Sequence, residues 1–406
     1  MSPSITEFDN LDECLICSGK RLYRYLDLGS QPLANDLKDD IEDSRNLYPL
    51  QLNVCVDCWH SQLSVAVNPE LLYRNYLYVS GTTKTLNDFF DNLAEVKTRE
   101  LGKGRVLDIA CNDGTFLEKF KNRGWEVYGI DPAENLRILC DRKGINTQTA
   151  FFAGKNYVRP NEKFDLITCF NVLAHIPNPV DFLNEAKCLL NEGGEILVQT
   201  SQRDMVIESQ FDTVYHEHHS FFSLSSFQSI AKRVGLFIKK IDLTDINGGS
   251  YLISFTKSEK LIPLSVSDMA QKEENEGRNS IELYERYTDK VNRIKSQVVS
   301  IVSQLREEGF RIIGFGAAAK GIVLLNYFDM NVDFVIDENE LKVGKYIAGV
   351  DAAVVTYPEE LDGKICFVIL AWNLYDEITG KITAMYPHLK CKFLRVFPEI
   401  SCSESE

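Results

Sequence analysis

Two distant segments of this 406-residue chain have the same order of elements, and that order restricts the fold more than any other feature. In residues 105–131 and again in residues 311–337, a short apolar strand precedes a turn of small residues, a helix and a second apolar strand. The second strand ends on an acid each time, Asp131 and Asp337. Parallel strands need a crossover connection, usually a helix, so this alternation is typical of α/β domains with a parallel sheet. We expect two such domains.

Length and charge narrow the class of protein. At about 150 residues per domain, the chain divides into two or three domains. The formal net charge of -15 is spread along the chain. It argues against a nucleic-acid polymer as partner, because phosphate binding needs a stripe of Lys and Arg. No apolar run reaches the roughly 18 to 20 residues that span a bilayer, and residues 1–10 lack a signal-peptide pattern. We expect a soluble, cytoplasmic protein without membrane contact.

Four of the eleven cysteines form two CxxC pairs near the N-terminus. The segment between the pairs has little helical periodicity, and four thiolates can close a tetrahedron around one zinc ion. A short segment with a small core needs such a metal to fold, so the zinc is expected to be structural. A redox or disulfide role and incidental core cysteines are the alternatives. The expected ligands are Cys14, Cys17, Cys55 and Cys58.

Changes of composition along the chain predict three domains. Residues 1–70 are assigned to the zinc-binding module, residues 71–250 to a Rossmann-like domain and residues 251–406 to a second Rossmann-like domain. The polar but periodically apolar residues 265–306 predict one long helix that joins the last two domains. Other expected elements of the middle domain are a helix at 85–100 and strands at 164–170 and 194–200.

The turn after the strand at 105–110 is the best candidate for a cofactor site. Asp108, at the end of that strand, can reach the amino group of S-adenosylmethionine (SAM), whereas its carboxylate would repel a pyrophosphate. Asp131 is placed to accept hydrogen bonds from both ribose hydroxyls. These acids favour SAM over a nicotinamide cofactor or no cofactor, although the spacing alone does not separate the three. The turn residues expected at the cofactor are Ala110, Asn112 and Gly114.

Residues 215–219, Tyr-His-Glu-His-His, hold three of the six histidines of the chain. Histidine titrates near neutrality, so this cluster can supply a general base, a general acid or a metal ligand. Donors in consecutive positions do not easily converge on one ion, which argues against a metal. In a strand, alternate side chains face opposite sides. A strand here would therefore argue against one shared site.

Five motifs occur in a fixed order over nearly the whole chain, beside the paired CxxC module. They are VLDIACNDGTF, CFNVLAHIPNPVDFL, QFDTVYHEHHSFFS, GFGAAAKG and VIDENELKVGKY. Together they resemble the nucleotide-sugar C-methyltransferases that make branched deoxysugars, such as the tetronitrose C-3 methyltransferase. The resemblance implies a zinc-binding N-terminal module, a SAM-binding middle domain and a Rossmann-like C-terminal domain that helps to hold a nucleotide-linked sugar. One departure is Val350–Val354, where similar proteins have a His-Ile-Pro stretch.

The resemblance also implies a reaction. The substrate would be a dTDP-linked 4-keto-deoxysugar, and carbon 3 would gain the methyl group. A ketone at carbon 4 acidifies the proton on carbon 3, so a base can remove it and the enolate carbon can attack the SAM methyl group. The family's catalytic base falls on His218. Tyr215 would orient the sugar or donate to the oxyanion, and Glu217 would hold a histidine tautomer or a substrate substituent.

Other residues of the motifs have less specific expected roles. Tyr76 would cap the substrate pocket or pack between domains. Asn171 and His175 follow a strand beside the cofactor, and His175 would contact substrate or SAM or be a structural histidine. His216 and His219 are expected to be structural.

The C-terminal glycine turn resembles a phosphate cradle, since backbone N–H groups at a helix start attract anions. The resemblance makes Lys320, Lys342 and Lys345 candidates for the nucleotide diphosphate, against the simpler reading of solvated surface lysines. The alternatives to sugar C-methylation are O- or N-methylation of a related sugar and a non-catalytic zinc-containing scaffold. We expect a small-molecule nucleotide-sugar substrate and a monomer or small homo-oligomer.

Overall fold

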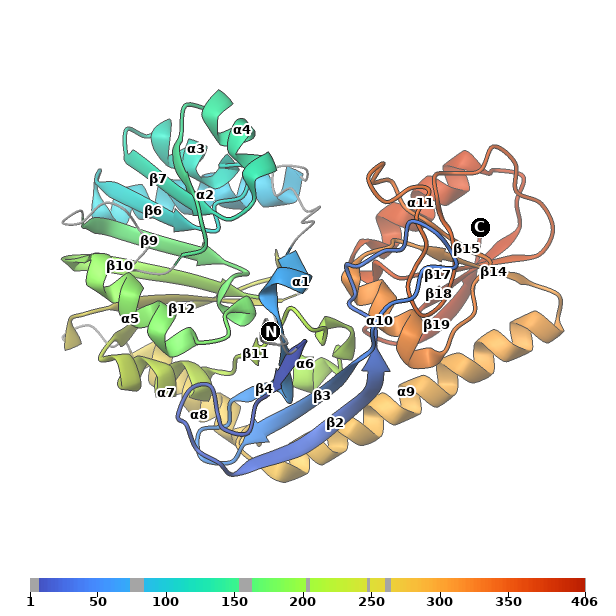
Figure 1. Ribbon diagram of the computed structural model, residues 1–406, viewed down its shortest axis with the longest axis horizontal. Coiled ribbons are helices and arrows are strands. Elements are labelled where there is room, and N and C mark those ends of the chain that lie inside the picture. Colours follow the sequence, from blue (N-terminus) through green and yellow to red (C-terminus); the bar gives the residue numbers. More distant parts are fainter. Residues whose placement is uncertain are drawn as a thin grey trace, which may run out of the picture.

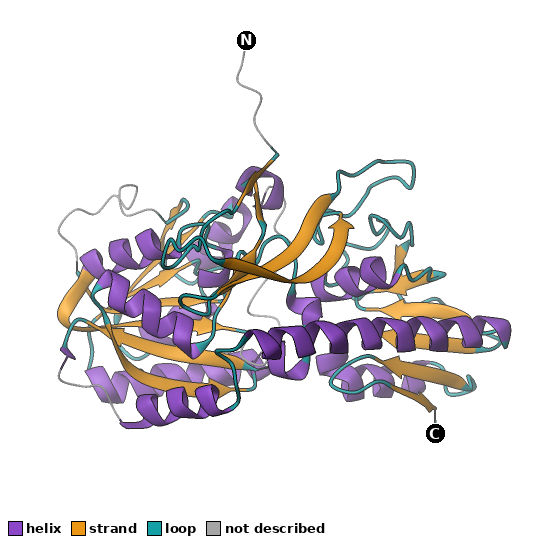
Figure 2. Cartoon of the chain, turned by 90° about the horizontal axis from the view of Figure 1, so that it is seen from below, coloured by secondary structure: helices purple, strands orange, loops and turns teal. Residues whose placement is uncertain are grey.

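The structure is a computed structural model that describes residues 7–73, 84–152, 163–201, 205–246, 249–259 and 264–405. Two α/β lobes lie side by side, and the strands of the N-terminal module and one long helix run between them (Figures 1 and 2). The expected α/β fold class is confirmed. The middle domain and the C-terminal domain each have a largely parallel sheet, whereas the N-terminal module is antiparallel.

The N-terminal module is built on an antiparallel pair, β2 (Leu22–Gln31) and β3 (Tyr48–Cys55). β4 (Ser61–Leu63) pairs with β3, and β11 (Ser220–Phe221) pairs with β4 from much later in the chain. The module also contains β1 (Phe8–Asn10), β5 (Val65–Val67) and α1 (Pro69–Tyr73). Because β11 directly follows the histidine cluster, the sheet of this module fixes one end of the cluster. The sequence pattern did not predict this pairing.

The sheet of the middle domain has the order β12-β13-β10-β9-β6-β7-β8. β6 is central and pairs in parallel with β7 on one side and β9 on the other, while β13 and β12 form an antiparallel edge. The strands are β6 (Arg105–Ile109), β7 (Glu126–Asp131), β8 (Asn146–Thr149), β9 (Phe164–Phe170), β10 (Leu190–Thr200), β12 (Phe237–Thr244) and β13 (Ser250–Thr256). The helices are α2 (Lys84–Leu101), α3 (Thr115–Lys121), α4 (Glu134–Arg142), η2 (Leu173–His175), α5 (Pro179–Leu189), α6 (Met205–Glu208), η3 (Phe211–Thr213) and α7 (Leu224–Val234). The chain order reverses between β6 and β9, and ligands of open α/β sheets bind at the carboxyl ends of strands at such a switch point.

The single long helix expected at 265–306 is wrong in one respect, because two helices occupy this region. They are α8 (Leu264–Asn275) and α9 (Ile281–Glu307). Gly277 adopts a left-handed φ of 74°, and the Ser280 side chain accepts a hydrogen bond from the backbone N–H of Leu283 and so begins α9. α9 alone runs along the bottom of both lobes (Figure 1). None of the described helices is both long enough and apolar enough to cross a membrane.

The C-terminal domain has the sheet order β16-β15-β14-β17-β18-β19. Its strands are β14 (Arg311–Phe315), β15 (Phe334–Ile336), β16 (Val354–Val355), β17 (Ile365–Ile369), β18 (Cys391–Arg395) and β19 (Ser401–Glu404). Its helices are α10 (Ala319–Phe328), η6 (Trp372–Leu374) and α11 (Tyr375–Met385). β14 pairs in parallel with β15 and β17, so a second switch point lies between β14 and β17.

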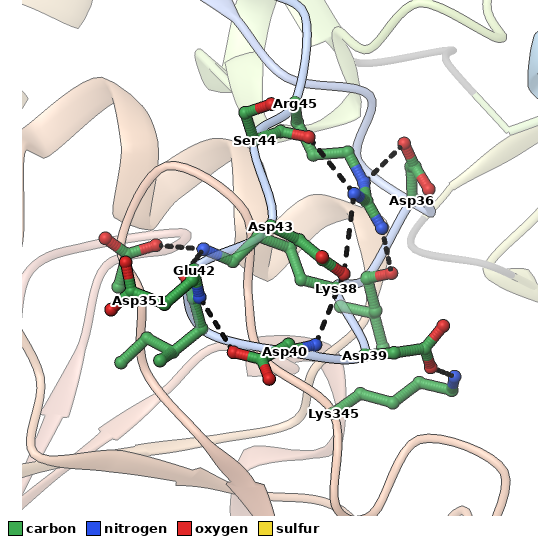
Figure 3. Close-up of polar contacts among 12 residues, drawn as sticks. Asp36, Lys38, Asp39, Asp40, Glu42, Asp43, Ser44, Arg45, Lys345 and Asp351 are labelled. Carbon is green, nitrogen blue, oxygen red and sulfur yellow. Dashed lines mark hydrogen bonds and ion pairs between the residues drawn. The ribbon is translucent and has the colours of Figure 1, made fainter.

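A loop of the N-terminal module docks on the C-terminal domain (Figure 3). Lys38 exchanges two backbone hydrogen bonds with Tyr346, each 2.8 Å long. The buried Lys38 ammonium forms an ion pair with Asp351 at 2.7 Å, and Lys345 pairs with Asp39. Asp351 lies in the segment Val350–Val354. In this protein that segment therefore contacts the N-terminal module.

Candidate active site

The first glycine turn has an unusual backbone. Ala110, Asn112 and Gly114 all have left-handed φ values, of 60°, 51° and 74°. Such a conformation costs a non-glycine residue roughly 1–2 kcal/mol, and strain of this kind is typical of ligand-binding turns. At Gly114 a side chain is also excluded by packing, since a Cβ atom would lie 2.7 Å from the Ile145 side chain. The three turn residues named from the sequence are thus brought together.

Asp131 holds this turn in place through one carboxylate oxygen and the segment after β7 through the other. Oδ2 accepts a 2.8 Å hydrogen bond from the backbone N–H of Asn112, and Oδ1 accepts one from Ala133. Asp337 makes the same two contacts in the C-terminal domain, accepting from the N–H groups of Ala317 and Asn339. Each carboxylate oxygen has a second lone pair. Asp131 can therefore still accept from ribose hydroxyls while it holds the turn.

Asp108 is buried beside this turn and accepts a 2.5 Å hydrogen bond from the Thr168 hydroxyl across the β6–β9 switch point. Burial raises the pKa of its carboxyl to about 7, although the Thr168 hydrogen bond opposes that shift. A buried carboxyl of this kind gains a great deal from a cationic partner. The amino group of SAM is such a partner, so the donor set fits the expected cofactor.

Asn171 and His175 follow β9 at the same switch point. Asn171 has a left-handed φ of 54°, and its buried side-chain oxygen has no hydrogen-bond partner among the described residues. The ring of His175 lies edge-on to the ring of His218, with the centroids 4.7 Å apart. His175 thus connects the edge of the sheet that carries the first glycine turn with the histidine cluster.

The histidine cluster is a turn and not a strand. The backbone N–H of His218 donates to the carbonyl of Tyr215 at 2.9 Å, and this closes the turn. The rings of Tyr215 and His218 consequently pack together with centroids 4.0 Å apart. The objection that a strand would separate these side chains does not apply.

His218 is buried and has a defined orientation. Its Nδ1 atom lies 2.7 Å from the carbonyl oxygen of Thr213, which can only accept, so Nδ1 carries the proton. Nε2 is then unprotonated in the neutral ring, and it has no hydrogen-bond partner within the described part of the chain. Burial lowers the pKa of His218 well below its ordinary value, with the neighbouring His175 adding to the shift. The neutral ring, with Nε2 as proton acceptor, is the form present at neutral pH.

The side chains of His216 and Glu217 face the N-terminal module. His216 contacts the Tyr48 carbonyl through Nε2 at 3.2 Å, and Glu217 accepts a 2.8 Å hydrogen bond from the Asn35 side chain. The second carboxylate oxygen of Glu217 is buried without a partner among the described residues, and burial raises the pKa of this acid. Both ring nitrogens of His219 are buried and have no hydrogen-bond partner among the residues that the structure describes. Tyr76 lies outside the described residues.

The two CxxC pairs converge as expected. The four sulfur atoms lie within 4.8 Å of one another, and two sulfur pairs, Cys14 with Cys58 and Cys17 with Cys55, are 3.5 Å apart. A tetrahedral zinc–thiolate site with bonds of about 2.3 Å needs sulfur separations of roughly 3.8 Å. The four cysteines therefore fit a zinc ion that has no open coordination position, and the histidine cluster forms no comparable group of donors in the described residues.

The three lysines have different surroundings. Lys345 is paired with Asp39. Lys342 donates to the carbonyl of Ala317 at 2.8 Å, and burial lowers the pKa of its ammonium group. Lys320 lies 5.5 Å from the ring of Trp372, with no hydrogen bond or ion pair to the described residues.

Sequence reasoning missed two residues beside the cluster, Asp212 and Trp372. The Trp372 indole N–H donates a 2.7 Å hydrogen bond to the buried Asp212 carboxyl from the other domain. Asp212 stands in the QFDTVYHEHHSFFS motif, but nothing in its spacing indicated a partner far along the chain.

Three family models match the chain in order. Residues 14–73 match a model described as "Putative zinc binding domain", residues 81–240 match "Methyltransferase domain", and residues 245–398 match "C-methyltransferase C-terminal domain". The three models together follow the three parts of the chain, and the last of them describes C-methyltransferases. The chain is a SAM-dependent methyltransferase, and the four cysteines of its N-terminal module fit the zinc site that the first model describes.

A curated relative matches this chain over most of its length. The C-methyltransferase NovU of Streptomyces niveus is 28% identical over 384 residues, which cover 91% of each chain. A ubiquinone biosynthesis O-methyltransferase of Hydrogenovibrio crunogenus is 26% identical over 181 residues, covering 38% of this chain and 75% of that protein. Among solved structures, the magnesium protoporphyrin IX methyltransferase of Synechocystis with bound SAH is 13% identical with a TM-score of 0.36, covering 46% of this chain and 93% of that one.

Proposed function

We propose that this enzyme transfers the methyl group of SAM to carbon 3 of a dTDP-linked 4-keto-deoxysugar, with His218 as the base. The proposal rests most directly on the hydrogen bond from His218 Nδ1 to the Thr213 carbonyl, because it leaves Nε2 to accept a proton. It is supported by the match to the C-methyltransferase NovU, which extends through all three parts of the chain.

The position of His218 also supports the proposal. Its ring lies against His175, which follows β9 at the carboxyl edge where Asp108 and the glycine turn lie. A sugar held beside His218 would thus face the methyl donor, whose sulfonium makes the methyl group electrophilic. Alignment of the carbanion with that group supplies much of the rate in such transfers.

The residues of this chain would then act as follows. Asp108 binds the cofactor amino group and Asp131 the ribose hydroxyls. Nε2 of His218 takes the proton from carbon 3. The electron pair of that C–H bond then forms a double bond between carbons 3 and 4 of the sugar. Tyr215 packs against His218 and orients the sugar, and Glu217 offers its oxygen that has no partner among the described residues to a polar substituent of the substrate.

The low pKa of His218 in the unliganded protein is compatible with this role. Burial favours the neutral ring and therefore the base form. Once a proton has been taken, the negative enolate beside the ring stabilises the imidazolium ion. The enolate formed from the substrate thus supplies the countercharge for the imidazolium ion.

O- or N-methylation of the sugar is the main alternative. The match to the O-methyltransferase covers 38% of this chain, whereas the match to the C-methyltransferase NovU covers 91%, so the second match accounts for more of the chain. Labelled substrate separates the two reactions, since C-methylation at carbon 3 must expel the hydrogen of that carbon and O- or N-methylation must keep it.

The test uses a panel of nucleotide 4-ketosugars that carry deuterium at carbon 3, with mass spectrometry of the products. The proposal predicts a methylated product that has lost the deuterium, and a preference for dTDP over other nucleotides. A methylated product that retains the label would refute C-methylation at carbon 3. A panel in which only non-sugar acceptors gain a methyl group would refute the substrate class.

A further inference from the structure

The switch point of the C-terminal domain faces the proposed base. α10 begins after the glycine turn of β14, and η6 follows the neighbouring strand β17. The two connections touch, since a Cβ atom at Gly316 would lie 3.1 Å from that of Ala371. This is the place where open α/β sheets bind their ligands. Lys320 and Trp372 are the chemically active side chains that the two connections contribute.

Three side chains are fixed together here. The Lys320 ammonium lies 5.5 Å from the centre of the Trp372 ring, a distance typical of a cation–π contact. The same Trp372 ring donates its N–H to the Asp212 carboxyl at 2.7 Å. The other carboxylate oxygen of Asp212 is fully buried without a hydrogen-bond partner among the described residues. Lys320 is thus attracted by a ring face and a nearby anion, yet its three N–H donors form no hydrogen bond to the described residues.

This group lies next to the base. Asp212 is in η3, directly before Thr213, whose carbonyl holds His218. η3 is anchored in the C-terminal domain, because Phe211 packs edge-on against Tyr327 and Phe397 at 5.3 and 5.4 Å. The positive charge of Lys320 lowers the pKa of both neighbours. At Asp212 it opposes the effect of burial, which raises the pKa, and at His218 it adds to the effect of burial, which lowers the pKa.

We propose that Lys320 is a catalytic residue that stabilises the negative charge on the sugar's carbonyl oxygen while His218 removes the neighbouring proton. This inference rests on the proposed function. As the C–H bond at carbon 3 breaks, its electron pair forms the double bond to carbon 4, and the carbonyl π pair moves to oxygen beside the Lys320 ammonium. When carbon 3 bonds to the methyl group, the sulfur of SAM keeps the electron pair of the broken bond and the oxygen becomes a ketone again.

The carbonyl oxygen is a better partner for Lys320 than the nucleotide diphosphate. The buried carboxyl of Asp212 would repel a dianionic group placed at the same ammonium. A carbonyl oxygen is neutral in the ground state and gains charge only during the reaction. Donors aimed at such developing charge contribute to kcat more than to binding.

The test compares Lys320→Met with Lys295→Met. Lys295 also lies over a tyrosine ring, that of Tyr327 at 4.2 Å, but on the outer helix α9, so it controls for the loss of a lysine. Lys320→Met is expected to lower kcat and the rate of deuterium exchange at carbon 3 by about 10²–10³-fold. Its affinity for SAM and for free dTDP should stay at the wild-type value, and Lys295→Met should behave as wild type in every assay.

Lys320→Gln serves as a second neutral variant if the methionine variant does not fold, and Lys320→Arg should regain part of the lost exchange rate. Unchanged kcat with weaker dTDP binding would overturn the inference in favour of diphosphate binding. Unchanged exchange in a folded neutral variant would overturn it as well. In both of these cases the wild type still methylates carbon 3. If the proposed function itself fails, the wild type neither exchanges the hydrogen of carbon 3 nor methylates that carbon.

Discussion

The Trp372 indole donates its N–H to the Asp212 carboxyl at 2.7 Å and so joins the C-terminal domain to the turn that carries His218. Hydrogen bonds to charged groups contribute about 1.5–3 kcal/mol. Trp372→Phe keeps a ring and removes the donor, so it should lower the free energy of unfolding by that amount. Urea unfolding measures the loss.

The pH dependence of this loss follows from burial, which raises the pKa of Asp212. Without the Trp372 N–H, burial of the charged Asp212 carboxylate costs more. The loss of unfolding free energy in Trp372→Phe should therefore be larger at pH 8 than at pH 5, where a larger fraction of the carboxyl is protonated. Trp125→Phe is the control, since Trp125 donates to the neutral Thr98 hydroxyl at 3.0 Å. Loss of this hydrogen bond should lower the free energy of unfolding by about 0.5–1.5 kcal/mol at either pH. Equal, pH-independent losses in both variants would show that the Asp212 charge plays no part.

Ion pairs between the N-terminal module and the C-terminal domain should differ in strength. The Lys38 side chain is 5% exposed and that of its partner Asp351 is 59% exposed, whereas those of Lys345 and its partner Asp39 are 33% and 78% exposed. Asp351→Asn leaves the buried ammonium without its countercharge and should cost about 1–3 kcal/mol. Lys345→Gln should cost less than about 1 kcal/mol, because water screens an exposed pair. Thermal unfolding of both variants tests this ranking, and a larger effect of Lys345→Gln would contradict it.

SAM binding should depend on pH through Asp108. Burial raises the pKa of its carboxyl to about 7, so between the unfolded value of about 3.9 and pH 7 the folded protein holds an extra proton. This group therefore makes the unliganded protein less stable as the pH rises through that range. The cationic cofactor needs the carboxylate, so affinity should fall by up to about tenfold per unit below pH 7 with release of a proton. Calorimetry in buffers of different ionisation enthalpy measures both quantities.

Asp108→Asn is the matched variant for this prediction. It should bind SAM more weakly and lose the pH dependence between about pH 5.5 and 7, because no proton is left to displace. A wild-type affinity that stays constant over this range would mean that Asp108 does not bind the amino group in its ionised form.

Removal of zinc should abolish turnover while leaving SAM binding intact. A module that needs its metal unfolds without it, and β4 would then no longer hold β11, which directly follows the histidine cluster. Chelator-treated protein and Cys14→Ser test this prediction. Their zinc content is measured by metal analysis, their SAM affinity by calorimetry and their turnover by product assays. Cys402→Ser, at an exposed cysteine, is the control and should change none of the three. Full turnover by zinc-free protein would contradict this role of the module.

Local patterns predicted the repeated units well because apolar strands, glycine turns and terminal acids are close in sequence. The strand at 126–131 and the convergence of the cysteines are examples. The sequence pattern did not predict that the joining helix is divided in two. The apolar periodicity continues across the division, where Gly277 adopts a left-handed conformation. Contacts between distant segments, such as Trp372 with Asp212, have no local signal, since a tryptophan after a strand usually packs in a core. The orientation of His218 likewise depends on a backbone carbonyl that sequence alone does not place.

The most direct test of the account is deuterium exchange at carbon 3. The wild type and His218→Asn are incubated in heavy water with a dTDP-4-keto-6-deoxysugar and S-adenosylhomocysteine, and exchange is followed by nuclear magnetic resonance. The account predicts exchange by the wild type and a loss of about 10²–10⁴-fold in the variant, with SAM affinity unchanged. Exchange at the wild-type rate in folded His218→Asn, or methylation of carbon 3 without any exchange by the wild type, would contradict it.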